Sequence, residues 1–160
     1  MKKIKKVLIA LDYDPTSQKV AESGFSLANS LGAETILYHV ISDSNNYASP
    51  EHVTILGFAG HLELDITQLE SIDGLKKASH QFLDKLKKHL TDDSIKTLVG
   101  EGEYAESILN TAKEIHADII VMGSHSKKWL ENIIMGSVTE KVLHHTTIPL
   151  FVVPTKKLKG

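Results

Sequence analysis

The chain has 160 residues, of which 41% are hydrophobic and 24% are charged, a composition typical of one globular domain with a sizeable core. Its net charge of −2 provides no broad positive field for nucleic acid or for an anionic membrane. All 18 basic residues are lysines, so backbone N–H groups, hydroxyls and lysines would have to hold any bound phosphate. Cysteine is absent, which excludes disulfides and thiolate chemistry and leads us to expect a cytoplasmic protein.

The first part of the chain predicts a strand, a helix and a second strand. Residues 7–11 form a continuous apolar run between charged residues, which is typical of a strand buried on both faces of a parallel sheet. This run stops at Asp12, far too early for a membrane span or a signal peptide. Apolar residues then recur at helical spacing over residues 16–31, and Gly32 follows as an expected left-handed C-cap. Residues 35–41 predict the second strand.

The rest of the chain alternates between predicted helices and strands after a segment without periodicity. We expect one domain over residues 1–160, with a variable insertion around residues 43–68 that is rich in Ser, Asn and Gly. The later predicted elements are a helix over 75–90, a strand over 96–99, a helix over 105–116, a strand over 118–122, a helix over 137–145 and a strand over 150–153. This alternation predicts an α/β fold with a doubly wound parallel sheet.

Residues 121–139 carry the clearest chemical signal. They begin at the carboxyl end of a predicted buried strand, pass through a polar loop, and end where Gly136 and Ser137 open a helix. A helix N-terminus presents unpaired N–H groups and the positive end of the helix dipole, which favour an anion. Gly123 permits close approach of a ligand to the backbone, and Thr139 adds a hydroxyl beside that of Ser137. The segment therefore predicts a phosphate site.

The spacing in this segment resembles that of the universal stress protein family, in particular its ATP-binding branch. The family motif is G-x-x-G, nine residues, then G-[S/T], and the chain reproduces it with Gly123, Ser126 and Gly136-Ser137, with serine in place of the second glycine. Similar segments at 7–12, 38–40, 100–102, 117–123 and 149–153 extend the resemblance over nearly the whole chain. The resemblance implies a Rossmann-like fold, related to the adenine nucleotide alpha hydrolases, with a five-stranded parallel sheet of order 3-2-1-4-5.

The resemblance also implies where an adenine nucleotide lies, whether ATP, ADP or AMP, accompanied by Mg²⁺. Asp12, with Leu11 beside it, and the backbone near Val40 are expected to meet the adenosine, while Met122 and Gly123 line the ribose. The residues expected around the phosphates are His125, Ser126, Gly136, Ser137, Val138 and Thr139. In the implied strand order the sheet reverses between its first and fourth strands, and ligands settle at such a switch point.

Three of these positions have plainer interpretations. Asp12 fits equally well as a helix cap or as a solvated turn residue, because Asp is common in Asp-x-Asp-Pro turns. His125 is either an exposed loop histidine or a phosphate contact. If the backbone at Ser126 needs a positive φ, serine costs about 1 kcal/mol there, and otherwise its hydroxyl replaces the contact that a glycine N–H would make.

A second glycine motif, at residues 100–105, matches the loose dinucleotide fingerprint G-x-G-x-x-[G/A]. We reject a dinucleotide site there because Glu101 and Glu103 would face the pyrophosphate, and because no acidic residue ends the following strand. The motif predicts a tight turn from a strand into a helix.

The histidines do not predict a dedicated metal site. His61, Glu63 and Asp65 alternate, but their segment has little other strand character, and His144 and His145 point apart on a helix.

The sequence therefore favours a nucleotide-binding regulatory module in the stress response. We expect no efficient enzyme, because the P-loop and the Ser-Gly-Gly-x-Asp-Ser loop of the ATP pyrophosphatases are both missing. The alternatives are a slow ATP-hydrolysing enzyme on the same fold and a structural dimer without a ligand. Residues 150–153 form an apolar strand at the expected sheet edge, which predicts a homodimer; the alternative is a monomer whose edge is covered by the insertion.

Overall fold

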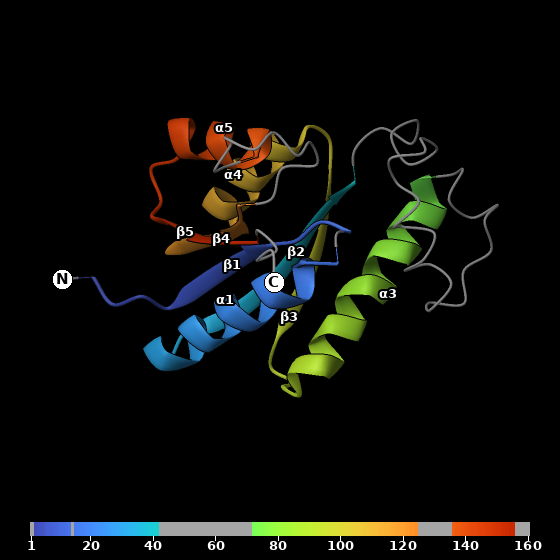
Figure 1. The fold of residues 1–160 in the computed structure, drawn as a ribbon, viewed down its shortest axis with the longest axis horizontal. Helices are drawn as coiled ribbons and strands as arrows, with labels where there is room; N and C mark the ends of the chain where they lie inside the picture. The colour runs from blue at the N-terminus through green and yellow to red at the C-terminus, as the bar shows by residue number, and fades with distance from the viewer. Residues whose placement is uncertain (1, 14, 42–71, 125–135, 156–160) are drawn as a thin grey trace, which may run out of the picture.

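The computed structural model describes residues 2–13, 15–41, 72–124 and 136–155, so the expected insertion around 43–68 lies outside the described residues (Figure 1). Five strands form one sheet of order β3-β2-β1-β4-β5, and each pairing between neighbours is parallel, which confirms the predicted fold. The elements are β1 (Lys6–Ala10), α1 (Ser17–Leu31), β2 (Glu34–Ile41), α3 (Ile72–Leu90), β3 (Lys96–Glu101), α4 (Tyr104–Glu114), β4 (Ile119–Gly123), α5 (Ser137–His145) and β5 (Leu150–Val153).

The sheet is covered by helices on both faces, with α1 and α3 on one side and α4 and α5 on the other (Figure 1). The side chains of β1, at the centre, alternate between two apolar cores: Val7 and Ile9 pack toward α1 and α3, and Leu8 packs toward α4 and α5. All three are fully buried. Double coverage is the physical reason that β1 reads as an unbroken apolar run.

The ends of the helices are set by residues with a left-handed backbone. Gly32 follows α1 with a φ of 63°, as predicted, and the N–H of Ala33 then bonds to the carbonyl of Ala28. The predicted helix over 105–116 was wrong at its C-terminus, because α4 ends at Glu114 and His116 takes a φ of 57°. Sequence periodicity continued through these residues and so could not locate the turn.

Strand β3 runs to Glu101, two residues beyond the predicted end at residue 99, and Gly100 makes this extension fit. A Cβ atom at Gly100 would overlap the Tyr38 hydroxyl and lie 2.8 Å from its Cζ. Tyr38 has little room to move, because its buried ring lies on β2 and its hydroxyl accepts a 2.8 Å hydrogen bond from Thr111 on α4. Gly100 thus lets the Tyr38 side chain pass beneath the β3 edge.

We predict that Gly100→Ala lowers the free energy of unfolding by about 1–3 kcal/mol, the usual cost of overpacking a core. Chemical denaturation of the single variants and of Gly100→Ala/Tyr38→Phe measures it. Loss of the hydroxyl relieves the overlap, so Tyr38→Phe should cost less in the alanine background than in the wild type. Equal costs in the two backgrounds would contradict the packing argument.

Candidate functional site

The carboxyl ends of β1 and β4 mark the point where the sheet changes direction. From β1 the chain moves outward through α1 to β2 and through α3 to β3, and it then returns through α4 to place β4 on the other side of β1. Ligands of doubly wound sheets bind beside such a switch point. The predicted residues from four elements come to this edge: Leu11 and Asp12 after β1, Val40 on β2, Met122 and Gly123 at the end of β4, and Gly136, Ser137, Val138 and Thr139 at the start of α5.

The start of α5 is fastened directly to the end of β4. The N–H of Gly136 donates to the carbonyl of Ser124 at 3.0 Å, and the hydroxyl of Thr139 donates to the carbonyl of Gly123 at 2.9 Å. Thr139 is buried, so its hydroxyl proton serves the packing of α5 on the sheet. Any contact of Thr139 with a ligand would therefore come from its main chain or from the lone pairs of its hydroxyl.

The N-terminus of α5 has no side-chain cap. Gly136 is the N-cap residue with an extended backbone, and no side chain accepts a hydrogen bond from the first turn. The first N–H groups of any helix lack partners within the helix, so those of Ser137 and Val138 remain available to an acceptor. Ser137 is exposed, whereas the Val138 side chain packs on the core between the sheet and α4 and α5. The arrangement suits an oxyanion that approaches along the helix axis.

The N-terminus of α4, on the same face of the sheet, is already occupied by a carboxylate. Glu103 accepts hydrogen bonds from the N–H groups of Ala105 at 3.3 Å and Glu106 at 2.8 Å. The Glu106 bond is the main cause that holds the pKa of Glu103 below its usual value, and Lys141 adds an ion pair at 3.3 Å. The motif at residues 100–105 is thus the tight turn that the sequence predicted, with Gly102 at a φ of 119°, and its helix has no free end for a pyrophosphate.

Two hydroxyl residues that the sequence analysis did not single out close the far side of this edge. The N–H of Ser124 donates to the carbonyl of Val153 at 2.9 Å, and the N–H of Thr155 donates to the Ser124 hydroxyl at 3.0 Å. These bonds tie the exit of β4 to the exit of β5. The position of Ser124 inside the glycine motif was the only available signal, and nothing in the sequence pointed to Thr155.

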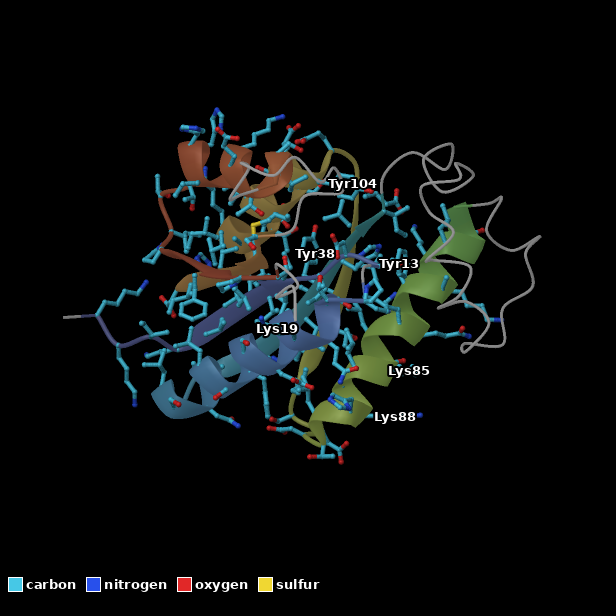
Figure 2. The ribbon with its side chains drawn as sticks, in the orientation of Figure 1. Tyr13, Lys19, Tyr38, Lys85, Lys88 and Tyr104 are labelled. Carbon is cyan, nitrogen blue, oxygen red and sulfur yellow. The ribbon has the colours of Figure 1, made fainter. Side chains whose placement is uncertain are left out.

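A buried group behind β1 was also missed from the sequence. The Nδ1 atom of His39 lies 2.7 Å from the carbonyl of Leu11, and the Tyr13 ring packs against the imidazole with the ring centres 4.3 Å apart. The Tyr13 hydroxyl bonds to Ser79 on α3, and Ser79 donates in turn to the carbonyl of Leu75. Burial raises the pKa of Tyr13 to about 12. Tyr13 therefore stays neutral between the sheet and α3, where Figure 2 labels it.

The remaining candidate residues give no further site geometry. His125, Ser126, His61, Glu63 and Asp65 lie outside the described residues. His144 faces Glu140 at 3.8 Å, whereas His145 bonds to the carbonyl of Lys141.

Within the described part of the chain, no three His, Asp or Glu side chains gather where they would hold a metal ion. In the same residues, none of the helices combines the length and the hydropathy that a membrane span requires.

With this geometry established, comparison with known proteins identifies the family. The model of the universal stress protein family matches residues 3–154. The chain belongs to the universal stress protein family. Universal stress protein MJ0577 of Methanocaldococcus jannaschii is 30% identical over 95% of this chain and 96% of its own length. Universal stress protein YxiE of Bacillus subtilis is 28% identical over 92% and 97% of the two chains.

Solved structures agree with this assignment. The structure of MJ0577 superposes with a TM-score of 0.69 at 26% identity and covers 98% of this chain and all of its own. The universal stress protein UspA of Lactobacillus plantarum shares the fold, with a TM-score of 0.67 at 19% identity over 96% of this chain and 99% of its own.

Proposed function

We propose that this universal stress protein binds an adenine nucleotide, ATP with Mg²⁺, and acts as a sensor or regulatory module in the stress response. The observation that carries the proposal is the uncapped N-terminus of α5, which is fastened to the end of β4 at the switch point of the sheet. A universal stress protein with this fold, 15% identical with a TM-score of 0.62, was solved in complex with cAMP. One member of the family therefore holds an adenine nucleotide on this scaffold.

The proposed site divides the nucleotide among three elements. The phosphates lie at the α5 N–H groups and the Ser137 hydroxyl, with His125 and Ser126 joining from residues outside the described part. The ribose lies over Met122 and Gly123, where the glycine leaves the backbone open. Asp12 and the main chain of Val40 meet the adenosine. Mg²⁺ needs few protein ligands because it keeps several waters and binds phosphate oxygens.

The proposed role is binding rather than efficient catalysis. Phosphoryl transfer depends on fixed positive charge around the leaving phosphate, commonly an arginine together with a P-loop lysine. The chain has no arginine and no P-loop motif. Any hydrolysis is therefore proposed to be slow, so that the bound nucleotide persists long enough to report its own concentration.

The edge strand β5 supports a homodimer as the proposed assembly. In the described sheet β5 pairs with β4 on one side only, which leaves the main-chain groups of its other side at the edge. Phe151 on this strand is 42% exposed, and Leu143 on the neighbouring α5 is 47% exposed. Antiparallel pairing of two such strands across a two-fold axis would satisfy both edges and cover the exposed Phe151.

The nucleotide site is tested with a matched pair of variants at Gly136. Asp and Asn are both good N-cap residues, so Gly136→Asp and Gly136→Asn should both keep the helix folded. The carboxylate of Gly136→Asp would also occupy the N–H groups and repel phosphate. We expect calorimetry to show no measurable ATP binding for Gly136→Asp and weakened but measurable binding for Gly136→Asn. Unchanged ATP affinity in Gly136→Asp would place the phosphates elsewhere.

The dimer is tested by light scattering at micromolar concentration. We expect a mass of twice the 17.6 kDa of the chain for the wild type, and a monomer for Val152→Lys, which places a charge in the paired edge. Leu98→Lys is the control, because it makes a similar change on β3 at the opposite edge and should leave the dimer intact. A wild-type mass near 17.6 kDa would refute the proposed dimer.

A further inference from the structure

The hydrogen-bond ladder between β1 and β2 changes partner at the switch point. Ala10 and Tyr38 are the last paired residues of the two strands, and one more main-chain bond follows, from the N–H of Leu11 to the carbonyl of Tyr38 at 2.8 Å. In a regular parallel ladder the next bond would run from the N–H of Val40 to the carbonyl of Leu11.

The carbonyl of Leu11 accepts a bond from His39 instead, at 2.7 Å from Nδ1. In the described residues, no main-chain bond joins Val40 to Leu11. A side chain of β2 has therefore taken the place of the main chain of β2.

The imidazole that makes this exchange is held firmly. A carbonyl oxygen only accepts, so Nδ1 must carry the proton, and this fixes the donor of the bond. His39 is 2% exposed, and it packs against the Tyr13 ring at 4.3 Å and edge-on against the Phe82 ring at 6.0 Å. The Tyr13 hydroxyl is anchored on Ser79 at 2.8 Å. The orientation of the ring is therefore set by β1 and α3 together.

The exchange leaves a donor beside an acceptor at the edge where the ligand is proposed. In a parallel strand the N–H and C=O of one residue point to the same neighbour, so both groups of Val40 face the space beyond the last residue of β1. A donor next to an acceptor complements an edge of adenine, which offers ring nitrogen N7 as acceptor and its amino group as donor. Guanine offers two acceptors on the same edge and would oppose the Val40 carbonyl.

We propose that His39 is a positioning residue for base recognition: by holding the Leu11 carbonyl, it keeps the Val40 N–H out of the ladder and available to the base of the bound nucleotide. The inference rests on the proposed function, because it concerns the same site. It assigns the preference for adenine to a buried residue that need not contact the ligand.

The test compares His39→Leu with His39→Asn. The asparagine amide retains a donor near the position of Nδ1, whereas leucine fills the space without one. We expect His39→Leu to lose about tenfold in ATP affinity and to lose most of its preference for ATP over GTP, while His39→Asn keeps both within about threefold. An apolar leucine suits a buried site better than asparagine does, so a merely structural role would rank the two variants in the opposite order.

Ser79→Ala is the matched control. It removes a buried hydrogen bond from the same cluster and leaves the bond from His39 to Leu11 in place, so its preference for ATP over GTP should equal that of the wild type. Calorimetry with ATP and with GTP measures all four proteins. Equal selectivity in wild type and His39→Leu would overturn the inference even if ATP binds.

A second readout does not depend on the nucleotide. Through-hydrogen-bond scalar coupling between the Val40 nitrogen and the Leu11 carbonyl carbon should be absent in the wild type and present in His39→Leu. A coupling in the wild type would overturn the inference. If the wild type bound neither nucleotide, the proposed function would fail, while the couplings would still report whether His39 displaces Val40 from the ladder.

Discussion

The two parallel ladders of β1 are the constraint on which the rest of the structure depends. β1 is the only strand of the described sheet whose two neighbours lie on opposite sides of the switch point, and its side chains are buried on both faces. Because β1 ends at Ala10 while β2 continues to Ile41, the main chain of β2 extends past the last paired residue. The opening at that edge is thus a consequence of strand length, and it decides where a ligand meets the backbone.

The chemistry of that edge follows from the absence of arginine. Without a guanidinium group, the chain depends on helix termini and hydroxyls to hold an anion. The two helix starts on one face of the sheet differ in a single respect, since Glu103 caps α4 and Gly136 leaves α5 without a side-chain cap. That difference, rather than the glycine motifs themselves, distinguishes the proposed phosphate position from the turn at residues 100–105.

The strands, the helices of the described regions and the sheet order were predictable from the sequence, because double burial of residues 7–11 and the helical spacing after residue 16 follow directly from the fold. The end of β3 was not, because it depends on Gly100 fitting beneath the Tyr38 ring from another strand. The bond from His39 to Leu11 was not predictable either. Strand alternation shows that residue 39 is buried, but it cannot show which carbonyl the imidazole reaches. The set of proposed site residues came from the resemblance, and the structure brings its described members to one edge of the sheet.

The central claim is that this universal stress protein holds an adenine nucleotide at the switch point of its sheet. The most direct test is mass spectrometry of the small molecules released when freshly purified protein is denatured, followed by titration of the emptied protein with ATP and Mg²⁺. The account predicts that an adenine nucleotide is released in an amount comparable to that of the protein and binds again on titration. Release of no nucleotide, together with no heat of binding for ATP, would contradict it and favour a structural dimer without a ligand.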